Sequence, residues 1–227
     1  MLSSTRMPRY SIGIDLGGTN LRAAAFDDAG KLLKKISGRT PVTDGPEAVI
    51  ADMAAAAGQL RDEFGLDSLA GIGVGVPGNI DMQRGVVAAW SNVPSFNGYP
   101  TRDELSTRLN TQVMLENDAN AAALGEHWAG AGKGTDDLVM LTLGTGIGGG
   151  IITRGQIVHG HVGMAGELGH ITVVPNGNPC GCGNSGCVEK YASATAVAAM
   201  ARNLNLGDLS ALRSEEHTSE LQSHHDL

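Results

Sequence analysis

The stretch Tyr10-Ser-Ile-Gly-Ile-Asp-Leu-Gly-Gly-Thr-Asn20 decides the fold, since a short apolar run ends there in an acidic, glycine-rich turn. Two further candidate strands, residues 21–26 and 31–36, follow it and are separated by Asp-Asp-Ala-Gly. This pattern predicts an antiparallel meander of three strands. The alanine-rich segment 46–64 has apolar residues at helical spacing and predicts that a helix comes next.

Strands and helices are expected to alternate along the rest of the chain. Strands are predicted at 69–76, 113–115, 138–143, 151–153, 156–158 and 171–174, and helices at 103–109, 119–129 and 188–204. The strand, glycine turn and strand at the start thus recur near residue 138. The repeat predicts a duplicated α/β fold with two lobes around a cleft, in which the N-terminal lobe covers residues 1–115 and the C-terminal lobe 116–212.

Composition excludes several classes of protein. The 227 residues carry a formal charge of −8, which argues against general binding to nucleic acid. No apolar run is long enough to cross a bilayer, and the first ten residues lack the pattern of a secretory signal. We therefore expect a cytoplasmic protein without a membrane or nucleic-acid partner.

Residues 213–227 read RSEEHTSELQSHHDL and differ in character from everything before them. They resemble the in-frame translation of a sequencing-library adapter, and we expect them to be a non-native tail. A natural polar tail is the alternative. If the tail is foreign, the natural protein continues past residue 212, the C-terminal lobe is incomplete here, and the chain exposes apolar surface and has little or no activity.

Two glycine turns each follow an apolar run, at residues 15–20 and 144–146. Such a turn alone is more often only a turn, but two of them favour a phosphate site, because glycine lets backbone N–H groups approach an anion. The carboxylate of Asp15 would act on a phosphate through Mg²⁺, which prefers oxygen ligands. No Gly-Lys-Ser/Thr follows, so neither turn is a P-loop. The candidate phosphate-binding residues are Asp15, Gly17, Gly18, Thr19, Asn20, Gly144, Thr145 and Gly146.

Asp118 follows a predicted strand and opens a predicted helix. The helix N-terminus favours the charged carboxylate, which would accept the proton of an attacking hydroxyl. An ordinary N-cap is the alternative, because Asp caps helices well.

His170 and three clustered cysteines, Cys180, Cys182 and Cys187, supply the four ligands of a tetrahedral structural Zn²⁺ site. An odd number of cysteines within eight positions argues against a disulfide framework. The alternative is a set of incidental buried thiols beside a surface histidine. The other histidines before the tail, His127, His159 and His161, are expected to be ordinary helix or loop residues.

Three segments together resemble the ROK family of sugar kinases and repressors, which has the two-lobed, actin-like (ribonuclease H-like) ATPase fold. They are Asp15-x-Gly-Gly-Thr, Asn117-Asp-Ala-Asn-Ala121 and Leu143-Gly-Thr-Gly-x-Gly-Gly-Gly150. The resemblance covers roughly residues 8–212. It implies that Asp118 is the catalytic base, that the Cys–His cluster holds zinc and that ATP is the donor. It also implies a set of hexose ligands: Gly78, Asn79, Ser91, Asn92, Asn117, Glu167, His170 and Glu189.

The resemblance implies ATP-dependent phosphorylation of a hexose at the 6-hydroxyl, with glucose as the favoured substrate. Kinases of N-acetylglucosamine, N-acetylmannosamine or fructose share nearly all of these motifs and stay open as alternatives. A sugar-sensing repressor is disfavoured, because only 14 residues precede Asp15 and a helix-turn-helix needs more. The family also implies a homodimer for the full-length protein.

Overall fold

The first lobe is built on a five-stranded sheet, and the structure, a computed structural model, describes residues 9–90 and 93–204. The predicted meander is confirmed as β1 (Tyr10–Leu16), β2 (Asn20–Asp27) and β3 (Leu32–Arg39), each antiparallel to the next. β4 (Leu69–Val76) and β7 (Val113–Asn117) add to the other edge in parallel, giving the order β3-β2-β1-β4-β7. The tail at 213–227 lies outside the described residues.

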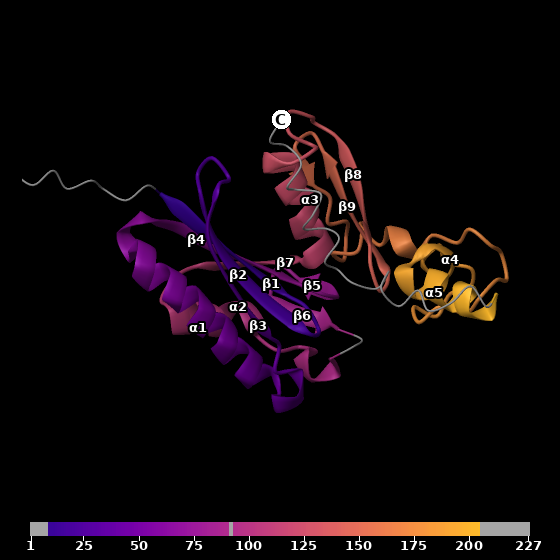
Figure 1. Cartoon of the computed structure of the whole chain (residues 1–227), viewed down its shortest axis with the longest axis horizontal. Coiled ribbons are helices and arrows are strands. Elements are labelled where there is room, and N and C mark those ends of the chain that lie inside the picture. The colour runs from indigo at the N-terminus through magenta and orange to yellow at the C-terminus, as the bar shows by residue number, and fades with distance from the viewer. Residues whose placement is uncertain (1–8, 91–92, 205–227) are drawn as a thin grey trace, which may run out of the picture.

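Two helices, α1 (Pro46–Phe64) and α2 (Thr101–Leu109), lie on one face of this sheet (Figure 1). Pro46 suits the first turn of α1, where an N–H would lack a partner, and Gly65 ends the helix with a positive φ of 85°. Ile50, Met53 and Leu60 of α1 are fully buried. Each buried aliphatic side chain contributes roughly 1.5–3 kcal/mol to the hydrophobic stabilisation of this core.

The second lobe begins at α3 (Asp118–Ala129), which starts directly after β7, and contains β8 (Leu138–Leu143), β9 (Ile147–Thr153) and β10 (Gln156–Ile157). These three strands form an antiparallel sheet in the order β10-β9-β8, so the described part of this lobe repeats the meander of the first. A Cβ at Gly148 or Gly150 would crowd α3, which explains why β9 is so rich in glycine.

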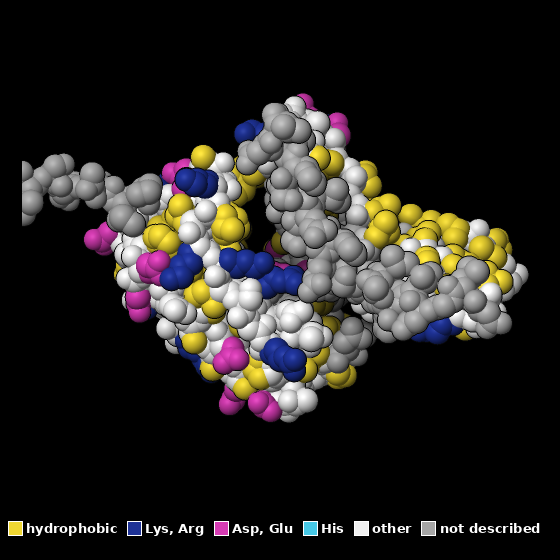
Figure 2. Space-filling model, in the orientation of Figure 1, with side chains coloured by type: hydrophobic (Ala, Val, Ile, Leu, Met, Phe, Trp, Pro, Cys, Tyr) yellow, Lys and Arg dark blue, Asp and Glu magenta, His cyan; other side chains and the backbone are white. Residues whose placement is uncertain are grey.

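A small unit extends from the second lobe and contains α4 (Glu189–Ala192) and α5 (Ala194–Asn203) (Figure 1). The single helix predicted at 188–204 is wrong, because Ser193 has extended backbone (ψ 157°) and its hydroxyl accepts from the N–H of Ala196 to cap α5. Figure 2 shows hydrophobic side chains gathered on this unit, as expected for exposed apolar surface. Its exposed apolar residues are Ile171, Val173, Val174, Met200 and Leu204.

The strand predicted at 171–174 is also wrong. The N–H groups of Val173 and Val174 both donate to Gly186 O, at 2.8 and 3.2 Å, and Ile171 O accepts from Val188 N at 2.9 Å. The backbone of this segment therefore forms its hydrogen bonds with the cysteine loop, residues 180–187, and with Val188, and it belongs to none of the described sheets. Four short 3₁₀ helices complete the described structure: Val42–Asp44, Leu66–Ser68, Pro94–Phe96 and Leu168–His170.

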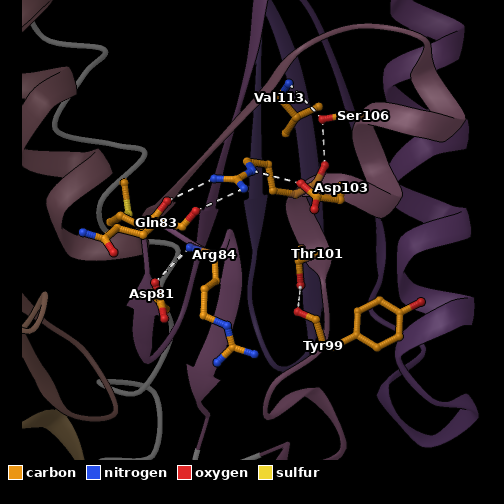
Figure 3. Close-up of polar contacts among 10 residues, drawn as sticks. Asp81, Gln83, Arg84, Tyr99, Thr101, Asp103, Ser106 and Val113 are labelled. Carbon is orange, nitrogen blue, oxygen red and sulfur yellow. Dashed lines mark hydrogen bonds and ion pairs between the residues drawn. The ribbon is translucent and has the colours of Figure 1, made fainter.

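The hairpin of β5 (Asn79–Asp81) and β6 (Val86–Ala89) was not predicted from the sequence. Arg102, at the start of α2, holds its turn by donating to Met82 O at 3.0 Å and to Gln83 O at 3.3 Å (Figure 3). Arg102 also contacts Asp103, and its own N–H donates to Gly85 O. This clamp connects α2 to the hairpin whose other end carries residues 78–79. Among the described helices, none is both long and apolar enough to cross a membrane.

Candidate functional site

Asp118 lies where the two lobes meet, at the first position of α3. A Cβ at Gly75 of β4 would come 3.5 Å from Asp118 Cα, so this glycine lets the helix approach the first sheet closely. Asn117 caps the helix, since its Oδ1 accepts from the N–H groups of Ala119 and Asn120 at 3.0 and 3.1 Å. The N-cap residue is therefore Asn117 and not Asp118, although Asp118 Oδ1 also accepts from the N–H of Ala119 at 2.8 Å.

Desolvation by the surrounding protein atoms dominates the electrostatics of the Asp118 carboxyl, although the residue as a whole is exposed. It raises the pKa of this carboxyl above the ordinary value of 3.8, and the negative charges of Asp15 and Glu167 raise it further. The N–H of Ala119, which donates to Asp118 Oδ1 at 2.8 Å, only partly offsets the shift. The stabilisation expected from the helix N-terminus is thus outweighed. Asp15 of the first lobe and Glu167 of the second are each close enough to Asp118 for their charges to act on it.

The first glycine turn is stabilised from behind by Thr40. Thr40 Oγ1 donates to Gly17 O at 2.8 Å, Thr40 N donates to Thr19 O at 2.9 Å, and Gly17 N donates to Asn20 O at 2.8 Å. Gly18, Thr19 and Asn20 stay exposed. Asp15 is also exposed and forms a 3.3 Å ion pair with Arg22. The turn thus presents backbone donors, a hydroxyl and a carboxylate to solvent, which fits a phosphate with Mg²⁺.

The second glycine turn is closed by a hydrogen bond from Gly144 N to Gly146 O at 3.0 Å. Two groups from the small unit hold it: Ala194 N donates to Gly144 O at 2.9 Å, and Glu189 Oε2 accepts from Ile147 N at 3.0 Å. Glu189, expected as a hexose ligand, therefore lies against this turn. The small unit and the turn are directly connected.

The first lobe contributes the end of β4 and the start of β5. Asn117 Nδ2 donates to Gly78 O at 3.1 Å, which ties this wall to the end of β7. Asn79 Oδ1 is buried and accepts no hydrogen bond from the described residues, which leaves an acceptor for a hydroxyl donor. Ser91 and Asn92 lie outside the described residues.

The second lobe contributes residues 158–170. Glu167 lies at the end of this loop and is 3.6 Å from His170, measured between Oε2 and Nε2. Sequence reasoning missed one contact here: His159 Nε2 is 2.7 Å from Glu116 Oε2. No local pattern could have predicted it, because 43 residues separate the two partners. His159 is therefore more than the ordinary loop residue that was expected.

The predicted metal ligands converge. One ligand atom from each of His170, Cys180, Cys182 and Cys187 lies within 4.8 Å of all the others. Cys180 Sγ is 3.5 Å from His170 Nδ1, and Cys182 Sγ is 3.7 Å from Cys187 Sγ. In a tetrahedral zinc site with bonds near 2.3 Å to sulfur and 2.0 Å to nitrogen, such edges measure about 3.5 and 3.8 Å. The four side chains thus fit a tetrahedral ion in both donor chemistry and spacing.

Gly78 offers a test of the wall that it lines. Its φ is 92°, and an added Cβ would overlap the carbonyl group of Ala89. We expect Gly78→Ala to lower the free energy of unfolding by more than about 2 kcal/mol, measured by urea denaturation, and to weaken hexose binding. Gly98→Ala is the matched control, because Gly98 has a φ of 76° but open space around its Cβ position. Equal losses in the two variants would contradict the steric argument.

Comparisons with known proteins identify the family of this chain and its relatives. A family model described as the ROK family matches residues 11–224. The chain is 46% identical to a glucokinase from Thermotoga maritima over 192 residues, which are 84% of this chain and 60% of that protein. It thus spans about 60% of the length of the curated relatives it matches.

Two solved structures show the same fold. A ROK family glucokinase from Streptomyces griseus, solved with glucose and AMPPNP, matches with a TM-score of 0.74 and 39% identity, covering 86% of this chain and 60% of that one. A ROK hexokinase from Thermus thermophilus matches with a TM-score of 0.77 and 39% identity, covering 90% of this chain and 67% of that one.

Proposed function

This chain belongs to the ROK family, and we propose that the full-length protein is an ATP-dependent hexokinase that phosphorylates the 6-hydroxyl of glucose. The observation that carries the proposal is the position of Asp118 between the lobes, where burial raises its pKa and Asp15 and Glu167 lie close by. Glucose is favoured because the relatives named above are glucokinases and a hexokinase.

Asp118 would act as the general base. The pKa of the Asp118 carboxyl is raised, so its carboxylate is a stronger base than an ordinary aspartate. A raised pKa also lies nearer to the pH at which the enzyme works, which favours proton transfer. The proton would move from the 6-hydroxyl to a carboxylate oxygen of Asp118 as the hydroxyl oxygen attacks the γ-phosphorus. The bond between that phosphorus and the oxygen bridging to the β-phosphate would break, and ADP would leave. Positioning and charge neutralisation supply most of the remaining rate enhancement in phosphoryl transfer.

The two glycine turns would bind the phosphates of ATP. The N–H groups of residues 18–19 and 145–146 and the hydroxyls of Thr19 and Thr145 are suited to phosphate oxygens, while the N–H groups of Gly17 and Gly144 close the turns themselves. Asp15 would hold Mg²⁺, which neutralises phosphate charge when bound. Glu167 and Asn79 Oδ1 would accept hydrogen bonds from hexose hydroxyls, and so would the carboxylate oxygen of Glu189 that does not accept from Ile147 N.

Zinc would have a structural role in this proposal. The four ligands hold a loop that runs from His170, three residues after Glu167, to Cys187, two residues before Glu189. Fixing the loop would therefore fix both proposed hexose ligands. We also expect the full-length protein to be a cytoplasmic homodimer. Light scattering on that protein tests the number of subunits.

A substrate panel tests the proposal. The full-length protein is assayed with glucose, N-acetylglucosamine, N-acetylmannosamine and fructose, and with ATP and polyphosphate as donors. We expect kcat/KM for glucose with ATP to exceed that for each other pair. Preference for an N-acetylated sugar would contradict the assignment of glucose as the substrate. Binding of sugars without any turnover would contradict the kinase assignment and favour a sugar-sensing regulator.

A further inference from the structure

Glu116 is a nearly buried carboxylate that receives three hydrogen bonds. Its Oε1 accepts from the backbone N–H of Asn117 at 2.9 Å and from Asn120 Nδ2 at 3.1 Å, and its Oε2 lies 2.7 Å from His159 Nε2. Its side chain is 16% exposed, and Asn120 is 3% exposed. A carboxylate satisfied this fully in a mostly buried position fixes the groups around it, because each lost donor would leave a buried acceptor unpaired.

His159 is the second residue of the loop 158–167, and its backbone carbonyl accepts a hydrogen bond from near the end of that loop. Val158 N donates to Ile151 O at 2.8 Å, which attaches the loop to β9, and Ala165 N donates to His159 O at 3.1 Å. Between them the chain uses the positive φ of Gly163, 78°, and an added Cβ there would lie 2.9 Å from Ile80 O in β5. The loop therefore reaches across to the first lobe, and His159 is its side-chain attachment to β7.

The loop ends at Glu167. An added Cβ at Gly166 would overlap Gly149 O of β9, so the segment before Glu167 packs closely against the sheet. The Glu167 carboxylate is near enough to Asp118 to raise its pKa. Glu116 is two residues before Asp118, so the contact between Glu116 and His159 joins the strand that leads into Asp118 to the loop that carries Glu167.

We propose that Glu116 and His159 are a positioning pair that holds the hexose-binding loop, and with it Glu167, at a fixed place opposite Asp118. The inference rests on the proposed function for the role of Glu167. Neither residue of the pair is among the proposed hexose or phosphate ligands. It acts through Glu167, so its loss should weaken hexose binding and leave the nucleotide site and the proton transfer intact.

Steady-state kinetics of the full-length protein test this role. His159→Ala should raise KM for glucose roughly 10-fold, with kcat at saturating glucose and KM for ATP within about twofold of the parent. His159→Gln keeps an N–H donor for Glu116 and should recover most of the lost affinity. His161→Ala is the matched control, since His161 lies in the same loop but is exposed. A change in kcat or in KM for ATP that equals the change in KM for glucose would overturn the assignment.

Amide hydrogen exchange gives a second measurement that needs no activity. In the same protein without ligands, His159→Ala should speed exchange over residues 160–167, while His161→Ala and His159→Gln should not. Equal exchange in His159→Ala and His161→Ala would reject the positioning pair even if the protein is a hexokinase. Faster exchange in His159→Ala in a protein that phosphorylates no hexose would keep the pair and reject the proposed function.

Discussion

Asp118→Asn in the full-length protein should lower kcat for hexose phosphorylation by about 10²–10⁴-fold, the usual contribution of a general base. Asparagine keeps the shape of the side chain and the oxygen that accepts from Ala119 N–H at 2.8 Å, so the start of α3 is preserved. Hexose affinity, measured by calorimetry, should therefore stay within a few-fold of the parent. Turnover at the parent's rate would remove Asp118 from the role of base.

The same variant should be more stable at neutral pH than the parent. The pKa of Asp118 is raised in the folded state, so between its ordinary value of 3.8 and its raised value the folded protein binds more protons than the unfolded chain. Stability contributed by this group therefore falls as pH rises through that window. Asparagine removes the burial cost and the repulsion from Asp15 and Glu167, and Tm at neutral pH should rise. Asp52→Asn, at an exposed position of α1, is the control and should leave Tm unchanged.

The dependence of kcat/KM on pH tests the ionisation of the Asp118 carboxyl. The acidic limb of kcat/KM should lie above the ordinary aspartate pKa of 3.8, because burial raises the pKa of Asp118. A limb at or below 3.8 would show that a less buried group controls the reaction.

Cys182→Ser should have the second large effect, the loss of zinc. Removing one of four ligands should lower zinc affinity by more than about 100-fold, since even changes behind the ligands cost 10–100-fold. Metal analysis of the purified protein should then find far less than one zinc per chain. Tm should fall because metal binding contributes folding free energy. Hexose affinity should fall as well, because Cys187 is two residues from Glu189.

Ser185→Ala, within the same loop, is the matched control because it leaves all four ligands in place. It should keep one zinc per chain and the parent's Tm. Loss of zinc in Cys182→Ser without loss of hexose affinity would separate the metal from the sugar site and contradict the proposed structural role.

Much of the fold could be predicted because it depends on local patterns. Pro46 and Gly65 delimit α1, and the alternation of buried and exposed residues in β1 is plain in the sequence. The hairpin of β5 and β6 was missed because strands of three and four residues carry too little periodicity. The β-branched run at 171–174 was misread as a strand because its partner is the cysteine loop, which a local pattern does not reveal.

The candidate site also contains some features that local sequence patterns predict and others that they do not. The convergence of His170 with the three cysteines could be predicted because all four residues lie within 18 positions of the sequence. The contact of His159 with Glu116 and that of Glu189 with Ile147 join residues more than 40 positions apart. Such contacts depend on how the lobes and the small unit pack, and no single segment specifies them.

The direct passage from β7 into α3 has one more consequence. Asn117 ends the strand and Asp118 begins the helix, with no spare residue between the lobes at this crossing. If one lobe swings relative to the other, this junction is the fulcrum, and atoms beside it travel least. In the proposed kinase, the parts of the two lobes that bind the hexose and ATP would then move apart and together while Asp118 keeps its position, so substrate binding and product release would leave its alignment intact.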